Sequence, residues 1–171
     1  LQPVARQQPQ RPAITAQDSA LTYAQFEQQV AGIAGALRED HGLKAGERVG
    51  IWMENSLEVF PVMFGIWRAG LVAVPINNKL HPKELAWILE NSGARLCVVS
   101  PDLAEKIADL PRETPLPPII ATGTRGYDDL LSGSPLTEAP TDPGAQAWLF
   151  YTSGTTGRPK GAVLTHRNLL F

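Results

Sequence analysis

Cysteine and histidine are both scarce in this sequence of 171 residues. Its single cysteine, Cys97, excludes a disulfide scaffold and fits a reducing, cytoplasmic setting. The three histidines, His41, His81 and His166, are too scattered to show a metal-ligand spacing. Because Cys97 lies within an apolar stretch, we predict a buried, unreactive thiol.

Long apolar runs and an excess of one charge are also missing. The longest strongly apolar run, 59–67, is about half of the roughly 18 residues that a membrane-spanning helix needs, so it predicts a buried core helix. The first 20 residues have no apolar centre, and no cleavable signal peptide is expected. Fifteen basic residues stand against 17 acidic ones, without a basic run, which argues against a nucleic-acid binder.

Helical and strand-like stretches alternate along the chain. A capping box at Thr22–Gln25 opens a helix, and Pro61 predicts a kink or a later start in a helix that Asn55 and Glu58 would open. The predicted helices are 22–42, 55–70, 82–93 and 102–110; the predicted strands are 48–53, 71–76, 95–99, 119–121, 147–151 and 162–164; stretches 111–118 and 132–144 are predicted loops. This order predicts an α/β fold with a mostly parallel, doubly wound sheet flanked by helices. Such sheets bind ligands beyond the carboxyl ends of their strands, so a strand-to-helix turn is the expected place for chemistry.

Several other residue types have an ordinary structural explanation. His166 precedes a short polar stretch and is interpreted as a structural histidine near a helix start rather than a ligand. Trp67 and Trp87 fall on apolar helix faces and are expected to pack in the core. Asp128 and Asp129 are interpreted as a solvated turn after Gly126.

One segment has an unusual composition. The apolar strand 147–151 runs directly into the segment 152–161. Four of the first five residues of this segment carry hydroxyl groups, and the segment also contains three glycines and Lys160. Hydroxyls and glycine backbone N–H groups are donors that can converge on phosphate oxygens, and glycine allows close approach. Lys160 adds a cation for the same anion. The segment therefore predicts a phosphate-binding loop.

The same segment has two alternative interpretations. The spacing differs from the common P-loop, GxxxxGK(S/T), because Pro159 and Gly161 flank Lys160, and this disfavours a Walker-type NTPase. A surface hairpin between Tyr151 and 162–164 has the same Ser/Thr/Gly-rich composition. On composition alone, the phosphate loop and the plain hairpin both stay open.

The longer string LFYTSGTTGRPKGAVLTHRNLL resembles the phosphate-binding signature of the adenylate-forming (AMP-binding) enzymes. Two weaker family segments, 21–23 and 67–76, lie upstream in the expected order, so the resemblance spans nearly the whole chain. It implies that residues 1–171 are an incomplete N-terminal subdomain of the AMP-binding domain. The chain would end just after the loop 150–161, with the C-terminal domain absent.

Within this family, segments 71–77 and 161–169 and the threonine at 155 are more similar to acyl-CoA synthetases than to peptide-synthetase domains. The resemblance implies a ligase that joins a small carboxylic acid to AMP, using ATP and Mg²⁺, and then passes the acyl group to coenzyme A. Two alternatives stay open. They are a peptide-synthetase-type adenylation domain that loads a carrier protein, and a noncatalytic phosphate-binding module.

The resemblance also assigns roles to residues. The β- and γ-phosphates of ATP would contact Thr152, Ser153, Gly154, Thr155, Thr156, Gly157 and Lys160. No catalytic residue and no metal ligand is expected in the chain, because the family segments that hold adenine, ribose and the adenylation lysine are missing. We therefore expect the isolated chain not to form acyl-adenylate, and its uncovered apolar surface to favour self-association.

Overall fold

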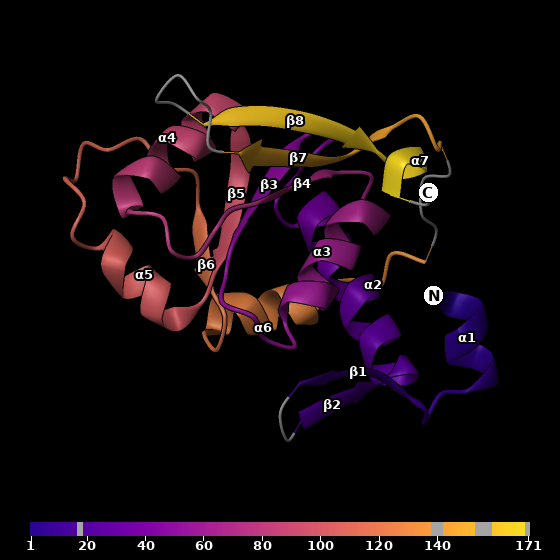
Figure 1. Cartoon of the computed structure of the whole chain (residues 1–171). Coiled ribbons are helices and arrows are strands. Elements are labelled where there is room, and N and C mark those ends of the chain that lie inside the picture. The colour runs from indigo at the N-terminus through magenta and orange to yellow at the C-terminus, as the bar shows by residue number, and fades with distance from the viewer. Residues whose placement is uncertain (17–18, 138–141, 153–158, 170–171) are drawn as a thin grey trace.

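Helices and strands alternate along most of the chain (Figure 1). The computed structural model describes residues 1–16, 19–137, 142–152 and 159–169. The helices are α1 Gln2–Gln7, α2 Tyr23–Glu39, α3 Val59–Arg68, α4 Pro82–Ser92, α5 Pro101–Ile107, α6 Arg125–Leu131 and α7 His166–Leu169. The strands are β1 Pro12–Ala16, β2 Ser19–Thr22, β3 Arg48–Trp52, β4 Val72–Pro75, β5 Ala94–Val99, β6 Ile119–Ala121, β7 Gln146–Thr152 and β8 Lys160–Thr165.

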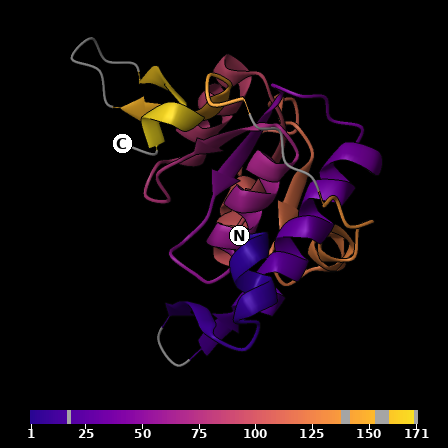
Figure 2. The same ribbon diagram turned by 90° about the vertical axis from the view of Figure 1, so that its right-hand side faces the viewer.

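Six of the strands form one sheet in the order β6-β5-β3-β4-β7-β8. Every neighbouring pair in it is parallel except β7 and β8, which are antiparallel. The other two strands form a separate antiparallel ribbon, β1–β2. Figures 1 and 2 place this ribbon and the β7–β8 hairpin at opposite ends of the molecule. The predicted mostly parallel sheet is confirmed.

Helices cover both faces of the sheet, so it is doubly wound as predicted. Buried side chains of α2, α3 and α6 pack on one face, and those of α4 and α5 pack on the other (Figure 1). As a result β3 is buried at four of its five residues rather than at alternate ones. Trp52 at its end is fully buried, and its indole Nε1 donates to the carbonyl of Asn77 at 3.1 Å.

Local sequence signals correctly predict the start of α2 and both ends of α4. At the start of α2, Thr22 Oγ1 accepts from the backbone N–H of Gln25 at 3.3 Å, and Gln25 Oε1 accepts from the N–H of Thr22 at 2.9 Å. Helix α4 has Pro82 at its first position and ends at Gly93, whose φ of 63° is left-handed. These residues interact within a few positions of one another, which is why the sequence reveals them.

Other boundaries differ from the prediction. Helix α3 begins at Val59, so the later start that Pro61 predicts is confirmed, whereas the start near Asn55 and a side-chain cap from Glu58 are not found. This start places Pro61 in the first turn, where its missing N–H leaves no intrahelical bond unmade. Helix α5 covers Pro101–Ile107 rather than 102–110.

Four described elements were not predicted: α1, β1, β2 and α6. Helix α1 and the β1–β2 ribbon occupy the N-terminal stretch for which no element was predicted. The acidic pair Asp128 and Asp129 is exposed, as expected, but lies in helix α6 and not in a turn. That helix buries only Tyr127 and Leu130, so its apolar periodicity is too short to recognise in the sequence.

The segment after α6 packs directly on the backbone of α2. Gly32 and Gly35, three residues apart on one face of α2, leave room for the main chain at Leu131 and Ser134. The N–H of Leu136 donates to the carbonyl of Ala31 at 3.0 Å. This hydrogen bond holds the first residues of the predicted loop 132–144 against α2.

A buried ion pair joins α2 to α3. Arg68 is 7% exposed, and its two terminal nitrogens donate to the two carboxylate oxygens of Glu27 at 2.7 Å each. The pair is bidentate, which is the geometry that suits arginine and carboxylate.

The described part of the chain contains no helix that is long and apolar enough to cross a membrane.

Candidate functional site

Thr152 and Lys160 face each other at the loop end of the β7–β8 hairpin. They form its last register pair, and both residues are exposed. The remaining predicted site residues, Ser153, Gly154, Thr155, Thr156 and Gly157, lie outside the described residues. The structure thus brings together the first hydroxyl and the lysine of the predicted loop, one on each strand.

The connection between them is not a strand-to-helix turn, and the predicted strand 162–164 is confirmed as part of β8. It joins two antiparallel strands, because residues 160–165 pair with β7 from Lys160 to Thr165 before α7 begins. Strand β7 pairs with β4 at one position only, Trp148 with Ala73, and Ala73 is the second residue of β4. Because β7 runs parallel to β4 and ends at Thr152, the loop begins at the carboxyl end of a parallel strand, as expected.

The base of the hairpin is held by Trp67 of α3. Its indole Nε1 donates to the carbonyl of Ala147 at 2.8 Å. Its ring also stands edge-on to those of Trp148 and His166, with centroids 6.1 and 6.2 Å apart. His166 begins α7, as its predicted place near a helix start requires, and Trp67 packs against the core as expected.

The loop end of the hairpin is held by α4. The Tyr151 hydroxyl donates to Asn91 Oδ1 at 2.7 Å, and the rings of Tyr151 and Trp87 meet edge-on at 6.1 Å. Burial raises the pKa of Tyr151, and nearby Arg48 opposes that change, so the hydroxyl keeps its proton and remains a donor. The sequence places Asn91 near the end of the predicted helix 82–93 and predicts no contact for it. The spacing of Trp87 and Asn91, one helical turn apart, was the available sequence signal.

The described residues offer no resident metal site. They contain no group of three or more His, Cys, Asp or Glu residues that could hold a metal ion. At the loop end of the hairpin, the described polar groups are the Thr152 hydroxyl and the Lys160 ammonium, which suit an anion. Magnesium does not fit these residues as a protein-bound cofactor.

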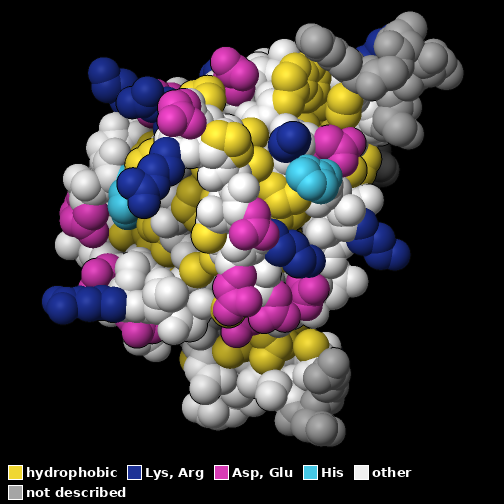
Figure 3. All heavy atoms as spheres, turned by 90° about the vertical axis from the view of Figure 1, so that its left-hand side faces the viewer, with side chains coloured by type: hydrophobic (Ala, Val, Ile, Leu, Met, Phe, Trp, Pro, Cys, Tyr) yellow, Lys and Arg dark blue, Asp and Glu magenta, His cyan; other side chains and the backbone are white. Residues whose placement is uncertain are grey.

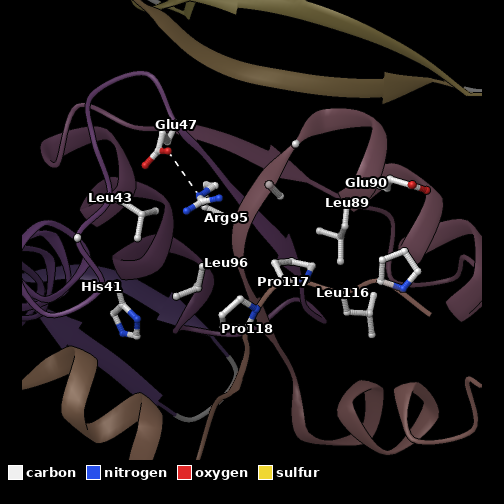
Figure 4. A pocket seen from close by; sticks show the side chains of 14 residues that line it. His41, Leu43, Glu47, Leu89, Glu90, Arg95, Leu96, Leu116, Pro117 and Pro118 are labelled. Atoms are coloured by element: carbon white, nitrogen blue, oxygen red, sulfur yellow. Dashed lines mark ion pairs between the residues drawn. The ribbon is translucent and has the colours of Figure 1, made fainter. Parts of the chain in front are cut away.

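A pocket of about 450 Å³ lies elsewhere, near the beginnings of β3 and β5. It is lined mainly by the end of α4, the start of β5 and the proline-rich segment 115–118. Figure 4 shows Glu47 and Arg95 pointing toward each other at this pocket, where they form an ion pair of 3.5 Å. Of the predicted site residues that the structure describes, neither Thr152 nor Lys160 lines it. On the face shown in Figure 3, acidic and basic side chains are mixed.

Cys97 is fully buried in β5, as predicted, and burial raises the pKa of its thiol to about 12. We expect it to resist a thiol reagent at pH 8 in the folded chain and to react in denaturant, as measured by the absorbance of released thionitrobenzoate. Above the ordinary pKa of 9.0, the unfolded chain loses this proton first. Stability should therefore fall as pH rises from about 9 toward 12. Rapid labelling under native conditions would contradict this burial.

Comparison with known proteins identifies the family. The AMP-binding enzyme family matches residues 1–171. A 3-hydroxybenzoate–CoA ligase of Aromatoleum sp. (strain CIB) is 33% identical over 96% of this chain, and surfactin synthase subunit 3 of Bacillus subtilis (strain 168) is 32% identical over 94%. The chain covers 33% of the first protein and 12% of the second.

A solved structure shows the same fold. The anthranilate CoA ligase AuaEII, in complex with anthranoyl-AMP, superposes with a TM-score of 0.86 and 28% identity, over 97% of this chain and 34% of that one. The flanked, mostly parallel sheet described above is therefore the one found in adenylate-forming enzymes. The chain belongs to the AMP-binding enzyme family.

Proposed function

We propose that this chain supplies the phosphate-binding hairpin of an ATP-dependent acyl-CoA synthetase. Such an enzyme activates a carboxylic acid as acyl-adenylate and transfers the acyl group to coenzyme A. The observation that carries the proposal is the pairing of Thr152 with Lys160 on either side of the sequence SGTTGRP, in a chain of the AMP-binding family. Because the chain spans about a third of the CoA ligase it matches, the activity of the whole enzyme is part of this proposal.

The chemistry needs donors where negative charge accumulates. Attack of the carboxylate on the α-phosphorus releases pyrophosphate, and charge builds on that leaving group. The Thr152 hydroxyl and Lys160 ammonium would contact the β- and γ-phosphates, together with Ser153, Gly154, Thr155, Thr156 and Gly157. These contacts hold the nucleotide in position and stabilise the developing charge. Magnesium would enter as the counterion of ATP.

Coenzyme A is the acyl acceptor that we favour. The relatives include both a CoA ligase and a surfactin synthase subunit, so family membership alone supports either thiol. Support for CoA comes from segments 71–77 and 161–169 and from the threonine at 155. The alternative acceptor is a carrier protein. The cytoplasmic location stays a prediction from the single cysteine.

The isolated chain is expected to bind inorganic tripolyphosphate without catalysing carboxylate-dependent ATP–pyrophosphate exchange. Calorimetry should show that Lys160→Ala weakens tripolyphosphate binding about tenfold, the effect of losing one charge-assisted contact. Lys106→Ala removes an exposed lysine from α5 and should leave binding unchanged. Equal losses in both variants, or no binding at all, would contradict the phosphate site. Exchange above background would refute the expected inactivity.

We also propose that the isolated chain self-associates through β8. This strand pairs only with β7 among the described strands, and Phe150 and Val163 on the hairpin are 45% and 50% exposed. An apolar strand with a free edge is a template for pairing with another chain. Light scattering should show a mass above the monomer that Val163→Lys reduces. Val4→Lys, at a similarly exposed valine on α1, is the control and should not reduce it.

A further inference from the structure

We propose that Tyr151 and Asn91 are positioning residues for the phosphate site: their hydrogen bond latches the loop end of the hairpin to α4. The inference rests on the proposed function and adds two residues that the sequence pattern did not single out. Neither needs to touch the nucleotide. Their role is to fix where Thr152 and Lys160 stand.

Such a latch can act because the ladder of the parallel sheet pairs with the hairpin at one register position. Strand β7 pairs with β4 only at Trp148, and β8 pairs only with β7. Thr152 lies four residues further on, about 13 Å at the rise of an extended strand. Between these points there is no further ladder pairing with the parallel strands, and Leu149 holds the strand by packing against the core. A directional contact at Tyr151 therefore helps to fix where the loop begins.

Tyr151 provides that contact directly before Thr152. Its ring meets Trp87 edge-on, and its hydroxyl reaches Asn91 Oδ1 at 2.7 Å. Trp87 and Asn91 are four residues apart on α4, so they form one socket on the same helix face. An aromatic edge and a hydrogen-bond acceptor together define the position and the orientation of the tyrosine ring.

The socket belongs to a firmly anchored helix. At the start of α4, His81 Nδ1 accepts from the N–H of Lys83 at 3.2 Å, and Glu84 Oε2 accepts from the N–H of His81 at 3.0 Å. On its inner face, Leu85, Ile88 and Leu89 are almost completely buried. The other end is tied to β3, because Arg48 Nε donates to the carbonyl of Ser92 at 2.7 Å.

The latch itself is exposed, so its effect on the position of the hairpin can be tested without unfolding the chain. Asn91 is exposed and Tyr151 only half-buried, so loss of their hydrogen bond should not unfold the chain. It should instead release the hairpin to sample other directions. Phosphate binding would then weaken, because part of the population no longer presents Thr152 and Lys160 together.

The test compares Tyr151→Phe, Asn91→Ala and the double variant with the unaltered 171-residue chain. Hydrogen exchange measured by mass spectrometry should accelerate in peptides covering 146–152 and 160–165 and stay unchanged in those covering α2. Calorimetry with inorganic tripolyphosphate should show about fivefold weaker binding for each single variant and no further loss in the double one. Asn91→Asp keeps the acceptor oxygen and should restore both readouts. Tyr23→Phe, at the start of α2, is the matched control.

The outcomes separate this inference from the proposed function. If the unaltered chain does not bind tripolyphosphate, the proposed function fails, and hydrogen exchange still tests the latch. Unchanged exchange in the hairpin peptides of both single variants would overturn the latch. So would additive losses of binding in the double variant, or Asn91→Asp behaving like Asn91→Ala.

Discussion

Replacing Gly35 by alanine is expected to lower the free energy of unfolding by about 3 kcal/mol. The added methyl group would overlap the carbonyl oxygen of Ser134 and lie 2.8 Å from its carbonyl carbon. These are main-chain atoms, and the nearby hydrogen bond from Leu136 to Ala31 holds their segment against α2. Alanine also has a higher helix propensity than glycine, by about 1 kcal/mol, but this gain is smaller than the free-energy cost of the overlap. Urea denaturation followed by circular dichroism measures the difference.

Gly126→Ala is the matched control for this overlap. Gly126 lies in α6, and a methyl group there would meet its nearest neighbours at 3.7 and 3.8 Å, which is ordinary contact. This variant should be as stable as the unaltered chain or slightly more stable. If Gly35→Ala were equally tolerated, the close approach of the 131–136 segment to α2 would be wrong.

Glu27→Gln is expected to lower the free energy of unfolding by about 3 kcal/mol as well. The change removes one charge and leaves the Arg68 guanidinium buried, at 7% exposure, without its counterion. A buried charge that loses its partner costs much more than the net contribution of the intact pair. The double variant Glu27→Gln, Arg68→Met removes that charge too, and should recover part of the loss. Urea denaturation of the three chains gives the comparison.

Arg95→Gln tests whether the burial of Arg68 causes the loss of stability expected for Glu27→Gln. Arg95 pairs with Glu47 at 3.5 Å, but its side chain is 67% exposed, where ion pairs contribute roughly 0–1 kcal/mol. Its loss should therefore be barely measurable. Similar losses for Glu27→Gln and Arg95→Gln would show that the environment of the Arg68 pair does not matter.

The sequence predicted those parts of the fold that depend on near neighbours. Apolar runs gave the buried strands, and the capping residues Thr22 and Gln25 gave the start of α2. It gave neither the Arg68–Glu27 pair nor the Tyr151–Asn91 bond, whose partners are 41 and 60 residues apart. Such pairs depend on which helix faces meet after folding. One sequence carries no direct record of that.

The candidate site divides in the same way. The composition around Thr152 indicated phosphate chemistry, and the family resemblance gave it a role. The strand 162–164 and the hairpin it forms with 147–151 followed from the sequence, whereas the expected strand-to-helix turn is wrong, because the hydroxyl-rich segment connects two antiparallel strands. On composition alone, the plain hairpin and the phosphate loop are alternatives. For this family member, the geometry of the first is compatible with the proposed chemistry of the second.

The edge-on contact of Trp67 with Trp148 gives the hairpin an optical signature of its own. The two indoles belong to α3 and β7, with centroids 6.1 Å apart and planes at 88°. Chromophores this close and mutually oriented couple their excited states, which produces a paired band of opposite signs in the far-ultraviolet dichroism spectrum. This exciton couplet should disappear when the hairpin leaves α3, even while the helices remain folded. Undocking of the hairpin can therefore be followed without an added label.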